Sequence, residues 1–224
     1  MITIANQDKI NKKHIANGVN IIDPKTTYIE ETVDIAPTSI IYPGVILEGN
    51  TIIEEAVVIG ANSQIKDTIV KKGAHINISV VVGAVIGEET EVGPFAYLRP
   101  GTNLANNCKV GGFVETKNIN VAEKSKIPHL SYVGDADIGS GVNIGCGVIT
   151  ANYDGVNKHR TTIGNNVFVG SNSNLIAPVV LEDNAYVAAG STITKDVKGE
   201  GLTIARARQT ELLNWERPKK NTDA

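Results

Sequence analysis

The segment HLSYVGDADIG, residues 129–139, places a histidine and a tyrosine in a chain that elsewhere repeats small and β-branched residues. The unperturbed pKa of histidine lies near neutrality, so His129 could take a proton from an attacking amine. Arginine and lysine donate charge-assisted hydrogen bonds that suit a phosphate, and tyrosine and asparagine can orient sugar hydroxyls. Polar groups of these kinds recur at short intervals, at Arg99, Glu115, Lys117, His129, Tyr132, Asn143 and Lys158. They predict a general base beside a site for an anionic sugar.

The elements that must position these residues follow from an aliphatic residue at every sixth position, as from Ile35 to Ile65 and from Ile163 to Ile193. Six residues make a short strand and a turn, in which glycine or asparagine takes the backbone angles that the turn requires. Three such units close a triangular coil, and stacked coils bury a continuous column of aliphatic side chains. We therefore predict an all-β parallel β-helix, with about nine coils between Val33 and Val197.

Three segments depart from this repeat. Residues 8–18, DKINKKHIANG, space apolar residues as a helix does and end in glycine, which predicts a short helix before the first coil. Residues 151–162, ANYDGVNKHRTT, interrupt the hexad and predict a protruding loop. The predicted organisation is a helix and linker at 1–24, a β-helix domain at 25–200 and a basic C-terminal tail at 201–224.

Composition and charge narrow the function classes. The net charge of −3 and the pI near 5.8 predict no nucleic-acid partner, and no apolar run reaches the roughly 20 residues of a membrane helix. The polar start MITIANQDKINKK is unlike a signal peptide, so we expect a cytoplasmic protein whose two cysteines are reduced. No metal site is expected, because the four histidines lack a close pair.

Longer motifs carry a family resemblance. The runs RPGTNLANNCKVGGFVETKN, HLSYVGDADIGSGVNIGCGVITANYDG and IARARQTELLNW resemble the acetyltransferase half of the bacterial bifunctional N-acetylglucosamine-1-phosphate uridyltransferase/glucosamine-1-phosphate N-acetyltransferase family. The resemblance extends from Ile10 onward. It implies a left-handed β-helix, a homotrimer and acetyl-CoA-dependent N-acetylation of glucosamine 1-phosphate, which feeds UDP-N-acetylglucosamine and cell-wall synthesis.

The resemblance also implies roles for single residues. His129 matches the catalytic base, and Glu115 matches an acidic position near the base. The positions implied for the sugar phosphate are Arg99, Lys117, Tyr132, Asn143 and Lys158. Those implied for acetyl-CoA are Cys146, through its backbone, Asn152, Tyr153, Ser171, Ala189 and Arg206.

The uridyltransferase half of this family carries a glycine-rich motif of the type LAAGxGTRM, which does not occur in the sequence. That domain is therefore expected to be absent, and a separate uridyltransferase domain or protein is a candidate partner. Three other readings remain open: an acetyltransferase for another amino sugar or nucleotide sugar, a non-catalytic trimeric scaffold, and metal-dependent hydration. The loop at 151–162 is expected to reach a neighbouring subunit, so that Lys158 acts in trans.

Overall fold

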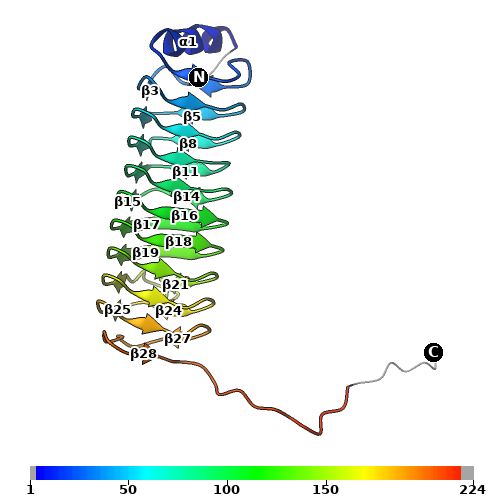
Figure 1. Ribbon diagram of the computed structural model, residues 1–224, viewed down its shortest axis with the longest axis vertical. Helices are drawn as coiled ribbons and strands as arrows, with labels where there is room; N and C mark the ends of the chain where they lie inside the picture. The colour runs from blue at the N-terminus through cyan, green and yellow to red at the C-terminus, as the bar shows by residue number, and fades with distance from the viewer. Residues whose placement is uncertain (1–3, 218–224) are drawn as a thin grey trace, which may run out of the picture.

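The computed structural model describes residues 4–217, which form a helix followed by one long stack of short strands (Figure 1). Helix α1 (Ile4–Ala16) lies at one end of the stack. The strands run from Asn20 to Thr203, slightly past both ends of the predicted domain at 25–200. None of the helices in residues 4–217 has the length and hydrophobicity needed to span a bilayer.

The first face of the stack is an eleven-stranded sheet in which neighbouring strands belong to successive coils. Nine of these strands, β4 to β26, lie between Val33 and Val197, as the hexad count predicts. The strands of this face are β1 (Asn20–Ile21), β4 (Ile40–Ile41), β7 (Val58–Ile59), β10 (His75–Ile76), β13 (Glu91–Val92), β16 (Lys109–Gly112), β18 (Lys126–His129), β20 (Asn143–Ile144), β23 (Phe168–Val169), β26 (Tyr186–Val187) and β28 (Leu202–Thr203).

A seventeen-stranded sheet covers the second and third faces, because β17 (Glu115–Val121) and β19 (Tyr132–Ile138) bend across the corner between them. The other strands of the second face are β2 (Tyr28–Ile29), β5 (Ile46–Glu48), β8 (Gln64–Lys66), β11 (Val80–Val82), β14 (Tyr97–Leu98), β21 (Ile149–Ala151), β24 (Asn174–Ile176) and β27 (Thr192–Ile193). Those of the third face are β3 (Asp34–Ile35), β6 (Ile52–Ile53), β9 (Ile69–Val70), β12 (Ala84–Ile86), β15 (Thr102–Leu104), β22 (Thr161–Ile163) and β25 (Val179–Leu181).

The aliphatic residues of the hexad fill the inside of the stack. Ile41, Leu47, Ile59 and Leu175 are fully buried, and most strands show one outward and one inward residue. Inward threonines and serines bond to the backbone, as when the Thr90 hydroxyl donates to Ala105 O at 2.8 Å. The predicted left-handed parallel β-helix is confirmed, and each coil places its outward side chains beside those of the next.

Helix α1 covers the open end of the first coil with a polar face. Gln7, Asn11 and His14, spaced four and then three residues apart, are all buried. The amides of Gln7 and Asn11 donate to Thr27 O at 2.8 and 3.0 Å, so they satisfy carbonyls at the start of the stack. The predicted N-terminal helix is confirmed, and Gly18 follows its end with a φ of 91°.

His14 is expected to make this end of the protein sensitive to acid. Burial, followed by the charge of Lys13, lowers its pKa below the ordinary 6.5, and Asp34 only partly opposes the shift. Its stabilising contribution is therefore complete above about pH 6.5 and is lost as the pH falls toward the folded pKa. Hydrogen-exchange protection factors of α1 should drop between pH 7.5 and pH 5.5 in the parent protein and drop less in His14→Gln. Equal losses in both proteins would contradict this prediction.

Candidate functional site

Four of the residues singled out from sequence stack in one line along a corner of the β-helix. These residues, which we call the histidine column, are His129, Cys146, Ser171 and Ala189. Backbone hydrogen bonds join successive members of the column: Gly147 N to His129 O at 3.3 Å, Asn172 N to Cys146 O at 2.8 Å and Gly190 N to Ser171 O at 2.8 Å. The tertiary structure thus brings together residues that lie far apart in the chain.

His129 lies at the end of β18 with an exposed side chain. Its carbonyl accepts a hydrogen bond from the Ser131 hydroxyl at 2.8 Å, which fixes the backbone. The imidazole has no hydrogen-bond or ion-pair partner among residues 4–217, so both ring nitrogens are open to a ligand. A histidine in this position can accept a proton without breaking a structural contact.

Arg206 and Asn143 relate differently to this column. Arg206 follows β28, and its Cδ lies 3.7 Å from the position that a Cβ on Gly190 would take, next to Ala189. Asn143 starts β20 and is in register with Lys126, at the opposite end of the first face from His129. Within one chain the structure therefore places Arg206 at the end of the histidine column and leaves Asn143 apart from it.

A second group of predicted residues, Arg99 and Lys117, stacks on the second face, and we call it the cation column. The backbone N–H of Arg99 donates to Thr116 O at 2.9 Å, which sets Arg99 beside Lys117. Arg99 Nη1 lies 2.8 Å from Glu115 Oε1. The carboxylate of Glu115 therefore pairs with Arg99 within the chain, and no contact with His129 is formed.

Residues 151–162 fold into a small hairpin that brings Lys158 back to its own chain. Tyr153 and Lys158 form an antiparallel bridge, and the Tyr153 hydroxyl donates to Gly155 O at 2.6 Å. A hydrogen bond from the backbone of Asn157, followed by one from His159, lowers the pKa of Asp154 to about 2. Within the chain, Lys158 is the main cause that lowers the pKa of Lys117.

Tyr132 lies between the two columns, at the start of β19. A Cβ on Gly134 would approach the Tyr132 hydroxyl to 2.5 Å, closer than real Cβ atoms come, and would lie 3.0 Å from Asn152 Nδ2. The missing side chain at Gly134 therefore lets the phenol extend along the second face toward the cation column. Tyr132 is thus placed to contact a molecule that spans His129 and Lys117.

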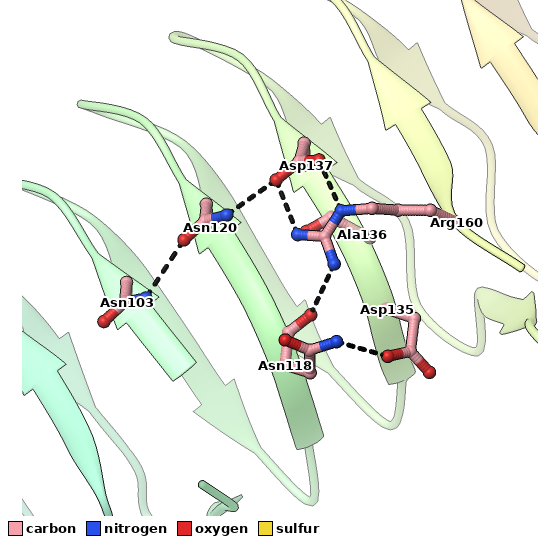
Figure 2. Close-up of polar contacts among 7 residues, drawn as sticks. All are labelled: Asn103, Asn118, Asn120, Asp135, Ala136, Asp137 and Arg160. Atoms are coloured by element: carbon pink, nitrogen blue, oxygen red, sulfur yellow. Dashed lines mark hydrogen bonds and ion pairs between the residues drawn. The ribbon is translucent and has the colours of Figure 1, made fainter. Parts of the chain in front are cut away.

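The structure also reveals polar residues that the sequence interpretation missed (Figure 2). Asp135 is 7% exposed and accepts a hydrogen bond from Asn118 Nδ2 at 2.5 Å. Its second donor is Nδ2 of Asn152, a position implied for acetyl-CoA, which the structure buries against Asp135. Arg160 holds the Asp137 carboxylate through Nε and Nη2, the latter at 2.6 Å. The sequence did contain a signal for the group around Asp135. Asn118 precedes Asp135 by 17 residues and Asn152 follows it by 17 residues, which is close to the length of one coil.

Opposing effects act on the carboxyl group of Asp135. Burial tends to raise its pKa, but the hydrogen bonds from Asn118 and Asn152 lower it. The positive charges of Lys117 and Lys158 lower the pKa further, and the balance leaves it below the usual range. Asp135 is therefore a buried carboxylate that two amide donors bind and that the charges of Lys117 and Lys158 stabilise.

Other expected features occupy different places. Cys108 is buried and Cys146 is half-buried, and both are free thiols. Residues 4–217 contain no cluster of three or more His, Cys, Asp or Glu side chains that could hold a metal ion. A shallow groove of about 560 Å³ lies on the third face, away from His129 and Lys117, and its lining includes Asn103, Asn120, Asp137, Thr162 and Asn165.

Comparison with known proteins places this architecture in a class. Residues 160–195 match the family model described as bacterial transferase hexapeptide (six repeats), which agrees with the six-residue repeat of the fold. The chain is similar to the bifunctional protein GlmU of Alkaliphilus oremlandii (strain OhILAs), with 54% identity over 211 residues that cover 94% of this chain and 46% of that one.

Similar coverage is found with a second relative, the bifunctional protein GlmU of Clostridioides difficile (strain 630), at 50% identity over 96% of this chain and 47% of that one. The chain thus spans about half the length of the curated relatives it matches. Among solved structures, LpxA from Acinetobacter baumannii aligns with a TM-score of 0.39 and 22% identity, over 80% of this chain and 71% of that one. That likeness is too low to bear on activity.

Proposed function

We propose that the chain transfers the acetyl group of acetyl-CoA to the amine of glucosamine 1-phosphate, with His129 as general base. The observation that carries this proposal is the arrangement of the two columns: His129 with an open imidazole on one side of Tyr132, and the Lys117–Lys158 pair on the other. An amino-sugar phosphate carries its amine and its phosphate at different positions. It can therefore reach His129 with the amine and the two lysines with the phosphate. Homology to GlmU proteins supports the same acceptor.

The cations bind and orient the acceptor. Lys117 and Lys158 donate charge-assisted hydrogen bonds to the phosphate, and Arg99 adds a third positive group, which Glu115 holds in place. Tyr132 contacts the sugar between the phosphate and the amine. Fixing the acceptor in this way turns an encounter between two substrates into a reaction within one complex.

Acetyl transfer then needs one proton acceptor. His129 takes a proton from the ammonium or from the attacking amine, and the amine nitrogen forms a bond to the thioester carbonyl carbon. The carbon–sulfur bond breaks, and the CoA thiolate leaves and is protonated to the thiol. The rest of the histidine column, Cys146, Ser171 and Ala189, offers backbone groups and small side chains along which acetyl-CoA lies, and Arg206 is placed at its far end.

The proposed assembly is a homotrimer. In one chain the two columns lie on the open surface, and a neighbouring copy would cover them and supply residues such as Asn143 that are apart from His129. After Thr203 the chain leaves the stack (Figure 1), exposing Leu212, Leu213 and Trp215 for contacts with another subunit. A uridyltransferase domain or protein is the proposed functional partner, since the relatives are bifunctional and twice as long.

The function is tested by thiol release from acetyl-CoA with the purified chain, using glucosamine 1-phosphate and glucosamine in parallel. We expect release with the phosphate and much slower release with glucosamine, because only the former engages Lys117 and Lys158. Equal rates would favour an acceptor without a phosphate. Binding of acetyl-CoA without turnover of either sugar would indicate another amino sugar or nucleotide sugar, and no binding would indicate a scaffold. Tightly bound zinc, detected by elemental analysis, would instead favour metal-dependent hydration as the activity.

A further inference from the structure

Asp135 occupies a corner where the three preceding coils carry no charge. The preceding residues at this corner are Gly83, Gly101 and Asn118, with φ values of 58°, 81° and 50°, and Asp135 has a φ of 48°. This left-handed backbone is favourable for glycine and tolerated by asparagine and aspartate. The corner itself therefore does not require a carboxylate, because an asparagine would take the same conformation.

Hydrogen bonding does not require a carboxylate either. On the third face, Asn103 Nδ2 donates to Asn120 Oδ1 at 3.0 Å, so stacked amides satisfy one another between coils of this protein (Figure 2). An asparagine at position 135 could join Asn118 and Asn152 in the same way after one amide rotates. What the aspartate adds is a negative charge.

That charge is costly where it lies. Asp135 is 7% exposed, and a buried carboxylate is destabilising unless cations or hydrogen-bond donors compensate it. The cations that act on it are Lys117, Lys158 and Arg160, and the two lysines are also the groups that repel each other across the proposed phosphate site. The carboxylate and the two ammonium groups therefore form a compensated cluster before any substrate arrives.

The cluster also reaches the hairpin that carries Lys158. Asn152, at the start of the hairpin, donates to Asp135, and Arg160, at its end, binds Asp137 two residues further along β19. Arg160 also donates from Nη1 to Asn118 O at 3.2 Å. Both ends of the hairpin are thus attached to one strand, and Gly134, next to Asp135 on that strand, is in register with Lys117.

We propose that Asp135 is a positioning residue that acts as the internal counter-ion of Lys117 and Lys158, and so holds Lys158 in place for an anionic substrate group. The identity of that substrate rests on the proposed function. The placement of the hairpin by Asp135 does not depend on it. Without the charge of Asp135, the two ammonium groups repel each other and the exposed hairpin moves Lys158 away.

The test combines Asp135→Asn with Lys158→Met, which keeps the apolar stem of the lysine but removes its charge. Binding of glucosamine 1-phosphate, measured by calorimetry, should weaken about tenfold or more in Asp135→Asn, the scale for a residue that orients a binding group. In the Lys158→Met background the same substitution should not weaken binding further, because there is no second ammonium left to position. Equal weakening in both backgrounds, or none in either, would overturn the inference.

The rate of amide hydrogen exchange in residues 151–162, measured without ligand, is a second test that does not depend on the substrate. Exchange should be faster in Asp135→Asn than in the parent, and should return to the parent rate in the double variant. Asp67→Asn is the matched control, because Asp67 occupies the same corner with the same φ of 48° and is exposed. If the parent does not bind glucosamine 1-phosphate, the proposed function fails, while unchanged exchange in Asp135→Asn overturns the role of Asp135.

Discussion

His129→Ala is expected to reduce turnover of glucosamine 1-phosphate by roughly 100-fold or more, the usual scale for loss of a general base. The fold should remain intact, because the imidazole is exposed and has no hydrogen-bond partner among the described residues. The backbone at this position is fixed by the Ser131 hydroxyl, which the substitution leaves in place. The effect should therefore appear in kcat, with little change in the KM of either substrate.

The measurement is thiol release as a function of pH, with circular dichroism as a check on the fold. In the variant the residual rate should rise with pH, because the amine then loses its proton without help. His75→Ala is the matched control: His75 is exposed on the same first face, in β10, and should show parental rates. Turnover that is unchanged in His129→Ala would remove this residue from the role of base.

Lys117→Ala and Lys158→Ala should each weaken binding of glucosamine 1-phosphate by roughly 10-fold to 100-fold, the range for a hydrogen bond to a charged group. The KM for acetyl-CoA should change much less, because both lysines lie beside Asp135 on the side of Tyr132 away from the histidine column. Discrimination against unphosphorylated glucosamine should shrink by a similar factor, since the lost contact is to the phosphate.

Steady-state kinetics with both substrates, repeated at two salt concentrations, test this expectation. Added salt should raise the KM for glucosamine 1-phosphate in the parent and have a smaller effect in the variants. Lys66→Ala is a suitable control, because Lys66 points outward from β8 on the same second face, three coils nearer to α1. Equal weakening of sugar phosphate and acetyl-CoA binding would contradict the assignment of these lysines.

Much of this molecule could be predicted from local pattern alone. An aliphatic residue at every sixth position requires a coil of three short strands, since no other arrangement buries each of them in one column. The helix before the first coil, the interruption at residue 151 and the end of the hexad near residue 200 follow from where the pattern stops. The identities of the residues around His129, together with Arg99 and Lys117, also indicated the resemblance to a family.

The alignment of residues between coils was decided by the tertiary structure. Coils differ in length by a residue or more, and the hairpin at 151–162 adds a larger offset, so spacing in the chain does not reveal which side chains stack. Only the hydrogen-bond register sets His129 beside Cys146 and pairs Glu115 with Arg99 rather than with His129. The hairpin that carries Lys158 is attached to β19 through Asp135 and Asp137, which lie in a coil distant from it in the chain.

The sequence by itself therefore determined the β-helix, its approximate length and the types of residue that could carry acetyl transfer, because the hexad acts over neighbouring residues. The tertiary structure decided which of those residues meet, since contacts between coils depend on register and on how the hairpin is attached. Asp135 illustrates the difference: within its own coil it is a tolerated turn residue, and only beside Asn118 and Asn152 of neighbouring coils does it become a buried, hydrogen-bonded carboxylate.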